Sequence, residues 1–313
     1  MRKSAMLKKK WFVLLVSIIS IIIIGVGIFT FSIYRSLENT ATSMHTPLER
    51  ANSDKRTSEI DFKQRDPLSF LVLGVDERTG DKGRSDSMML LTVNPNKKSI
   101  QMVSIPRDTR TEIIGKGFED KINHAYAFGG PEMSIATVEN FLDIPVDYFV
   151  QINMESFKDI VDAVGGVTVN NKLEFSQNGH HFPLGEITLN GEEALSFSRM
   201  RSIDSDFGRQ QRQRDILQGV INKGANISSI TKIDDILNVL GTNVRTNLTF
   251  DEMVDIQANY KDARHNLTQH QLTGSGTKID NIYYLIVAEE DRLAISKQLK
   301  EHLELDSDVA SNN

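Results

Sequence analysis

The feature that most constrains this chain is an uncharged, mostly apolar run from Trp11 to Tyr34. As a helix with a rise of about 1.5 Å per residue, this run extends roughly 36 Å, enough to cross a hydrocarbon core of about 30 Å. Trp11 and Tyr34 stand at its two ends, where aromatic rings favour the membrane interface. The run is longer than the apolar core of a cleavable signal peptide, and no small-residue cleavage site follows it. We therefore predict an uncleaved transmembrane anchor over residues 11–34.

The charges that flank this run predict its orientation. Arg35 alone follows the run closely, whereas five cations precede it: Arg2, Lys3, Lys8, Lys9 and Lys10. The flank of a transmembrane helix that carries more lysine and arginine stays in the cytoplasm. We therefore predict that residues 1–10 are cytoplasmic and that the chain after the anchor is extracellular. The predicted location is thus the cell membrane, crossed once. A cytoplasmic tail of this length is too short for a DNA-binding or signalling domain.

The overall charge restricts the partners of the extracellular part. The formal net charge is −6, and it falls to −11 when the five cations of the tail are set aside. Such a surface disfavours nucleic acid and other extended polyanions, so any anion site must be a local concentration of arginine and lysine. The chain has no cysteine. This excludes disulfides, thiolate metal sites and a cysteine nucleophile.

The pattern after the anchor divides the chain into three parts. Residues 35–65 are polar and lack an apolar period, which predicts an extracellular stalk. Residues 66–305 are long enough for one large domain, and residues 306–313 are predicted to be a disordered tail.

Within the domain, strand and helix patterns alternate along the chain. Ser69–Asp76 and Tyr148–Asn153 have the apolar runs of buried strands, whereas Pro131–Leu142 and Gly208–Lys223 have helical periods. This alternation predicts a layered α/β domain.

Two carboxylates stand at neighbouring strand ends. Asp76 ends a buried strand, and Asp86 stands just before the next predicted strand, Met88–Asn94. In open α/β sheets, strand ends are where ligands bind. Two carboxylates without a nearby histidine or cysteine suit a hard cation such as Mg²⁺. The alternative is a simple turn, because aspartate is common in turns.

Arg107 follows Pro106 at the end of a predicted strand, so its backbone is held rigidly. Its planar guanidinium matches two oxygens of a phosphate. The alternative is an ion pair with Asp108 or with a residue of a neighbouring strand.

The apolar residues of the helix predicted over residues 208–223 show which of its sides faces the core. Its apolar side is formed by Ile216, Leu217, Val220 and Ile221. At 100° per residue, Arg209 and Gln213 share that side, whereas Gln211 and Asp215 point outward. A buried arginine needs a partner, and a phosphate is favoured at the first turn of a helix. The alternative partner is Asp206, acting as N-cap and counter-ion.

Five motifs follow one another behind the predicted anchor. They are Phe70-Leu71-Val72-Leu73-Gly74-Val75-Asp76, Arg84-Ser85-Asp86-Ser87, Val103-Ser104-Ile105-Pro106-Arg107-Asp108, Lys121-Ile122-Asn123-His124-Ala125-Tyr126, and Arg199-Met200-Arg201 with Asp206-Phe207-Gly208-Arg209-Gln210. As a set they resemble the LytR-CpsA-Psr family of envelope phosphotransferases. The short link Ser202-Ile203-Asp204-Ser205 leaves the local loop geometry open.

The resemblance implies a three-layer α/β/α domain with a central mixed sheet. It also implies a polyprenyl tail in an apolar tunnel, for which the candidate lining residues are Phe128, Ile135, Phe141, Phe149 and Phe157. By match of position, Asp76 and Asp86 would coordinate Mg²⁺. The pyrophosphate would be held by Arg107, Arg199, Arg201, Arg209 and Gln213, with help from Arg78 and Arg84.

The reaction implied is Mg²⁺-dependent phosphoryl transfer from a polyprenyl pyrophosphate-linked glycan, such as a teichoic acid, to peptidoglycan. A sugar hydroxyl attacks the glycan-side phosphorus, and the lipid monophosphate leaves. Asp86 or Asp108 would serve as the base, beside the catalytic arginines 107, 199 and 201. One alternative is a lipid-pyrophosphate phosphatase that uses water. The other is a non-catalytic binding or regulatory protein of the envelope, which the paired acids disfavour.

Overall fold

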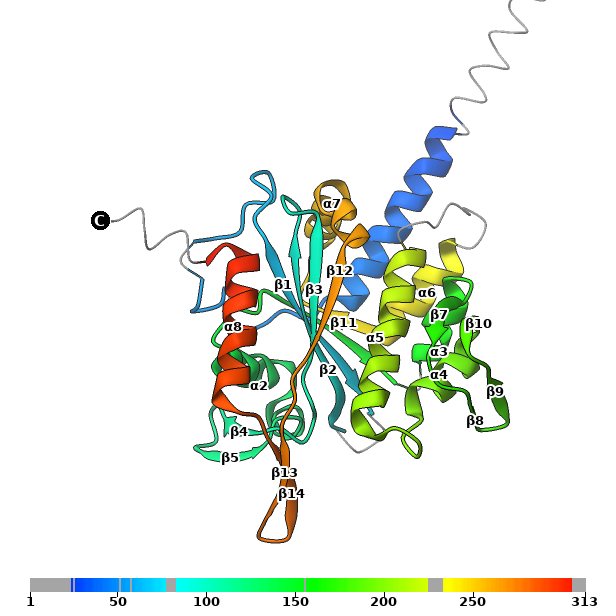
Figure 1. Ribbon diagram of the computed structural model, residues 1–313. Helices are drawn as coiled ribbons and strands as arrows, with labels where there is room; N and C mark the ends of the chain where they lie inside the picture. The colour runs from blue at the N-terminus through cyan, green and yellow to red at the C-terminus, as the bar shows by residue number, and fades with distance from the viewer. Residues whose placement is uncertain are drawn as a thin grey trace, which may run out of the picture.

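A mixed sheet of six strands, in the order β11-β6-β1-β2-β3-β12, forms the centre of the protein (Figure 1). This computed structural model describes Ile24 and residues 26–50, 52–56, 58–76, 83–154, 156–224 and 233–305. The strands are β1 (Leu68–Val75), β2 (Ser85–Asn94), β3 (Ser99–Ser104), β6 (Tyr148–Asn153), β11 (Val244–Thr246) and β12 (Leu267–Gln271).

Strand direction brings distant parts of the chain to one edge of this sheet. β1 runs parallel to β6, β3 runs parallel to β12, and β2 is antiparallel to both β1 and β3. The C-terminal ends of β1, β3, β6 and β12 therefore meet the start of β2. We call this the carboxyl edge of the sheet.

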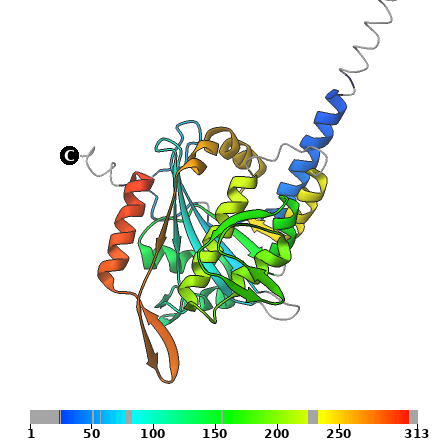
Figure 2. The same ribbon diagram turned by 45° about the vertical axis from the view of Figure 1, so that its right-hand side comes forward.

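Both faces of the sheet are apolar and both are covered by helices. In β1, Leu71 and Leu73 pack toward α2 (His124–Leu142) and α8 (Glu289–Leu303), whereas Val72 packs toward α5 (Ser205–Gly224). Figures 1 and 2 show α2 and α8 on one side of the sheet and α5 on the other. The remaining elements near the second face are α6 (Ile233–Asn243), α7 (Phe250–Asn259) and a 3₁₀ helix, η2 (Lys261–His265). The predicted α/β class and mixed sheet are confirmed.

A small lobe, residues 157–199, lies against the outer side of α5. It consists of α3 (Phe157–Ala163), β7 (Val167–Asn171), β8 (Phe175–Gln177), β9 (His180–Phe182), β10 (Gly185–Leu189) and α4 (Gly191–Arg199). Its own apolar cluster includes three rings in mutual contact, Phe175, Phe182 and Phe197, together with Ile216 of α5. α5 is therefore covered from two sides.

The first turn of α2 is separated from the rest of that helix. Gly129 and Gly130 have non-helical backbone angles, with φ of +66° at Gly130, and Pro131 begins the second helical run. The predicted helix began at Pro131, so the turn that carries His124 was missed. Two hairpins complete the fold: β4 (Arg110–Ile113) with β5 (Phe118–Lys121), and β13 (Ser275–Ile279) with β14 (Ile282–Ile286).

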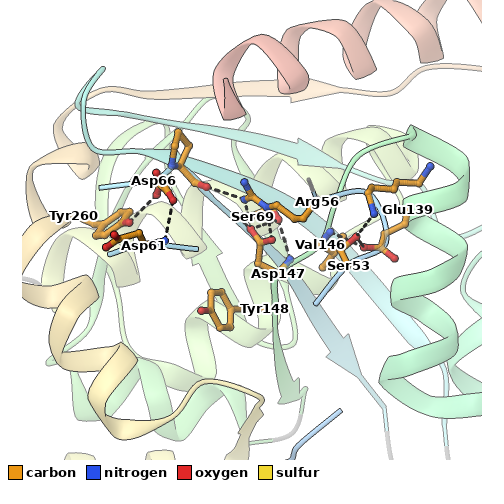
Figure 3. A network of polar contacts seen from close by, with 12 residues as sticks. Ser53, Arg56, Asp61, Asp66, Ser69, Glu139, Val146, Asp147, Tyr148 and Tyr260 are labelled. Carbon is orange, nitrogen blue, oxygen red and sulfur yellow. Dashed lines mark hydrogen bonds and ion pairs between the residues drawn. The ribbon is translucent and has the colours of Figure 1, made fainter. Parts of the chain in front are cut away.

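The residues predicted as a stalk pack against the domain. A helix over residues 26–44 buries Ala41 and Met44, and the chain then crosses the end of the sheet opposite the carboxyl edge. There Arg56 binds Asp147 at 2.6 Å, in the polar network of Figure 3. These contacts tie the segment that follows the predicted anchor to the base of the sheet.

Much of the predicted anchor lies outside the described residues. These exclude residues 11–23 and 25 of the span, as well as the predicted tails 1–10 and 306–313. Among the helices that the structure describes, none combines the length and the apolar character needed to cross a bilayer.

Candidate functional site

Asp76 and Asp86 meet at the carboxyl edge, as their strand-end positions predict. Asp76 follows β1, and Asp86 is the second residue of the antiparallel β2. The backbone N–H of Asp76 donates to the carbonyl of Arg84 at 3.3 Å. Both carboxylates line two neighbouring pockets. They form the wall that the two pockets share.

The first of these, which we call the arginine pocket, has a volume of about 400 Å³. It brings together residues from five separate parts of the chain: Asp76, Asp86, Met154, Ser198, Arg199, Arg201, Arg209 and Gln213. Arg199 ends α4, while Arg209 and Gln213 lie on one side of α5. The Ser87 hydroxyl donates to Gln213 Oε1 at 3.1 Å. The structure thus gathers six predicted site residues around one cavity.

Arg107 stands beside this cavity as the partner of an acid. Its Nη1 lies 2.9 Å from Asp86 Oδ1, and its Nε lies 3.6 Å from Asp108 Oδ2. Burial alone would lower the pKa of Arg107, but Asp86, Asp108 and Asp206 outweigh burial and raise it. The ion-pair alternative for Arg107 is therefore realised. Its Nε still makes no hydrogen bond within the described part of the chain.

Arg209 is almost fully buried, with 4% of its surface exposed. Its Nη2 binds Asp206 Oδ1 at 2.6 Å, so the counter-ion alternative is also realised. Asp206 is not the N-cap, because α5 begins at Ser205. Burial lowers the pKa of Arg209, and the positive charges of Arg201 and Arg107 lower it further. Its Nε is buried without a hydrogen-bond partner among the described residues. A bound anion would offset the repulsion from Arg201 and Arg107, and it would accept a hydrogen bond from this Nε.

Arg212 was missed by the sequence analysis. Its guanidinium binds Asp204 at 2.6 and 2.9 Å and donates to the carbonyls of Phe197 and Met200 at 3.1 and 2.6 Å. It also lies 5.4 Å from the centre of the Phe175 ring. These contacts hold the loop that presents Arg199 and Arg201, which settles the geometry that the sequence left open.

Gly208 allows this arrangement. A Cβ atom at Gly208 would lie 2.0 Å from Asp204 Oδ2, so only glycine lets Asp204 approach α5 closely enough to bind Arg212.

The outward orientation predicted for Gln211 and Asp215 is wrong. Gln211 Nε2 donates to Gln269 Oε1 of β12 at 2.6 Å and to Asp215 Oδ1 at 2.8 Å. Arg214, only 2% exposed, donates to Ser104 Oγ at 2.7 Å on the same side. The phase argument assumed one buried side, whereas α5 packs between the sheet and the small lobe.

The second pocket, which we call the His124 pocket, has a volume of about 570 Å³. Its described lining is Asp76, Gly83, Arg84, Asp86, His124, Ala127 and Phe128. Arg84 is thus separated from the arginine pocket by the carboxylates. Arg78 lies outside the described residues. Asp108 lines neither pocket and accepts a hydrogen bond from Lys121 Nζ at 2.7 Å.

The five residues predicted to line a lipid tunnel lie in three different places in the described part of the chain. Ile135, Phe141 and Phe149 pack in the core beneath α2 and α8, Phe157 packs in the small lobe, and Phe128 lines the His124 pocket. Closeness in sequence to the motifs does not determine which side of the sheet a residue occupies.

Incompletely buried apolar side chains gather instead on the sheet face beneath α5. They are Phe70, Val93, Val150, Ile152, Leu217, Ile221 and Leu267. An apolar pocket of about 300 Å³ opens on this face, between the sheet, the end of α5 and α7, where Phe70, Ile221 and Ile256 contribute to its lining.

The paired carboxylates fit a cation that takes its other ligands from the substrate. The described residues contain no group of three or more acidic or histidine side chains that could hold a metal. Mg²⁺ is commonly held by only one or two carboxylates, with phosphate oxygens of the substrate completing its shell. Asp76 and Asp86 fit that arrangement and do not fit a metal cage made by protein alone.

An α/β domain with arginines and two carboxylates at the carboxyl edge of its sheet is of the class that handles phosphorylated substrates. The chain belongs to the LytR_cpsA_psr family, whose model matches residues 31–301.

Two curated relatives show how far the similarity extends. The chain is 53% identical over 307 residues to the polyisoprenyl-teichoic acid–peptidoglycan teichoic acid transferase TagU of Bacillus subtilis, covering 97% of this chain and all of that one. It is also 53% identical over 298 residues to TagU of Bacillus licheniformis, covering 95% and 97% of the two chains.

Solved structures agree with these relatives. The crystal structure of B. subtilis TagU is 56% identical and covers 76% of this chain and 97% of that chain, with a TM-score of 0.63. The structure of TagT bound to LI-WTA is 33% identical and covers 83% and 100% of the two chains, with a TM-score of 0.73.

Proposed function

We propose that this protein transfers teichoic acid from a polyisoprenyl carrier to peptidoglycan. The named activity of relatives that are 53% identical over nearly the whole chain supports this function. The observation that carries it is the arginine pocket, in which Arg199, Arg201 and Arg209 face Asp76 and Asp86. A pyrophosphate matches this pocket, because its oxygens bind several arginines and also bind a metal ion that is held by two carboxylates.

In this proposal the arginines position and stabilise the donor. Arg199, Arg201 and Arg209 hold the oxygens of the pyrophosphate, and Gln213 is fixed beside them by Ser87. Phosphoryl transfer requires little covalent chemistry from the protein, so positioning and neutralisation of charge account for most of the rate. The same cations stabilise the lipid phosphate as it leaves.

We also propose Mg²⁺ as the cofactor, held by Asp76 and Asp86. When bound, it would neutralise charge on the pyrophosphate oxygens. Arg107 contributes by binding Asp86 at 2.9 Å, which fixes that carboxylate at the wall of the arginine pocket.

We place the carrier tail along the apolar sheet face beneath α5. The apolar pocket that opens on this face, with Phe70, Ile221 and Ile256 in its lining, supports this placement. We further propose that residues 11–34 anchor the protein in the cell membrane with the domain outside, where peptidoglycan is available.

The test is incubation of the purified domain with a polyprenyl pyrophosphate-linked glycan, Mg²⁺ and peptidoglycan oligomers, followed by mass analysis. We expect a glycan–phosphate–peptidoglycan product, together with weaker donor binding when the prenyl tail is shortened. Free glycan phosphate in place of that product would instead show a phosphatase and would contradict the proposed transfer.

Replacing Arg209 separates a role in phosphate binding from a structural role. Arg209→Lys keeps the charge but loses the paired donors, so we expect turnover to fall roughly 10- to 100-fold in a folded protein. Arg209→Ala should also weaken donor binding while barely changing the melting temperature, because Arg201 and Arg107 already oppose the charge at this site.

If the main role of Arg209 is the ion pair with Asp206, we expect the opposite pattern of stability and turnover in the two variants. The Ala variant would then lose roughly 3–5 kcal/mol of unfolding free energy, and the Lys variant would be nearly as active as wild type. Melting curves and initial rates for the two variants decide between these roles.

A further inference from the structure

His124, paired with Asp120, lines the pocket on the other side of the two carboxylates from Arg199, Arg201 and Arg209. His124 Nδ1 lies 2.7 Å from Asp120 Oδ2. Asp120 also accepts hydrogen bonds from the Lys121 N–H at 2.7 Å and from the Tyr284 hydroxyl at 3.3 Å. Burial raises the pKa of Asp120, but the hydrogen bonds from His124 and Lys121 outweigh burial and lower it. Asp120 is therefore an ionised acceptor, and it favours the neutral tautomer of His124 that donates its Nδ1 hydrogen and carries the lone pair on Nε2.

The first turn of α2 directs this histidine at the His124 pocket. His124, Ala127 and Phe128 lie at positions i, i+3 and i+4, so they share one side of the turn, and all three line the pocket. The break at Gly129 and Gly130 gives this turn an orientation independent of the rest of α2. His124 meets Asp120 through Nδ1, so Nε2, on the other edge of the ring, takes no part in that contact.

Two exposed aromatic rings extend the pocket toward solvent. Phe128 and Phe118 are 39% and 47% exposed and meet edge to face, with ring centres 5.9 Å apart. The Phe128 ring also meets the His124 ring edge to face, at 6.3 Å. Apolar rings beside charged and hydrogen-bonding groups suit a sugar, which has an apolar C–H face and a rim of hydroxyls.

We propose that the His124 pocket receives the acceptor sugar of peptidoglycan and that His124 Nε2 takes the proton of its attacking hydroxyl. This inference rests on the proposed transfer function. The hydroxyl oxygen forms a bond to the glycan-side phosphorus, and the bond from that phosphorus to the bridging oxygen breaks. The electron pair leaves with the lipid phosphate, while the proton moves to Nε2 and Asp120 stabilises the resulting imidazolium.

The arrangement of the two pockets supports this assignment. In-line displacement requires the nucleophile to approach from the side opposite the leaving group. Of the described residues that line them, the arginine pocket and the His124 pocket share only Asp76 and Asp86, so a phosphorus held at these carboxylates has Arg199, Arg201 and Arg209 on one side and His124, with Arg84, on the other.

The two carboxylates predicted as bases are less suited to this role. Asp86 is already bound by Arg107 and Asp108 by Lys121, and Asp108 lines neither pocket.

The test uses His124→Gln, His124→Ala and Phe128→Ala in the transfer assay, with donor binding measured separately using polyprenyl pyrophosphate. We expect both His124 variants to bind donor normally and to lose roughly 10²- to 10⁴-fold in transfer rate. Added imidazole should restore part of the transfer in His124→Ala but not in Phe128→Ala. Phe128→Ala should mainly raise the KM for the peptidoglycan oligomer.

His181→Ala is the matched control, because His181 also lies near a carboxylate, 3.5 Å from Glu174, but in the small lobe. It should transfer at the wild-type rate. Transfer by His124→Gln within about threefold of wild type, or loss of donor binding in that variant, would overturn the role of His124. A wild-type protein that binds donor but transfers nothing would instead overturn the proposed function itself.

Discussion

Arg212→Ala is expected to lower the unfolding free energy by roughly 3–5 kcal/mol, although Arg212 lines neither pocket. The substitution leaves the buried carbonyls of Phe197 and Met200 without their donor and removes the cation packed against Phe175. Asp204 loses its partner at the same time. Because the loop between Arg199 and Arg201 depends on these contacts, turnover should fall together with stability. Thermal melting and initial rates measure the two effects.

Arg209→Ala is the matched control, since both arginines lie on α5 and both are buried. We expect only the Arg212 variant to melt early, by roughly 10 °C at 2–4 °C per kcal/mol for a domain of this size. A melting temperature for Arg212→Ala within about 1 °C of wild type would show that the loop is held by other contacts.

Asp76→Ala and Asp86→Ala are each expected to reduce transfer by on the order of 10³-fold while the domain remains folded. Both acids are only half-buried at the carboxyl edge, so their removal opens no core cavity. The loss reflects charge that is no longer available to hold a cation against the pyrophosphate. Rates measured across a range of Mg²⁺ concentrations, with melting curves for each variant, test this.

Glu186→Gln, an exposed acid of β10, is the control and should behave as wild type. If either aspartate variant retains near-normal Mg²⁺-dependent turnover, that residue does not contact the metal.

The sequence predicted the acids of the site because their positions follow from strand order alone. Asp76 and Asp86 flank one connection between two adjacent antiparallel strands, so the register that pairs Gly74 with Ser87 brings them together. Arg209 was found because the apolar side of α5 has a clear phase.

The same reasoning failed wherever a second packing surface intervened. Arg212 lies off the apolar side of α5, and its burial depends on the small lobe, whose position no local pattern reveals. His124 was overlooked because the helix was expected to begin at Pro131, beyond the Gly129-Gly130 break. The spacing of Asp120 and His124 was the one available signal. The tunnel residues stay a prediction, because proximity along the chain carries no information about which face of a sheet a side chain occupies.

The ion pair between Arg56 and Asp147 has a consequence for how far the carrier must travel. It fastens the entering chain to the base of the sheet, whereas the two pockets lie at the far end of the strands. β1 has eight residues, so the base of the sheet and its carboxyl edge are separated by roughly 26 Å at 3.3 Å per residue. A headgroup at the level of the bilayer would not reach the reacting position under the proposed anchoring. Under the proposed anchoring, the part of the prenyl chain next to the headgroup would rise out of the bilayer with it in each turnover and return afterwards.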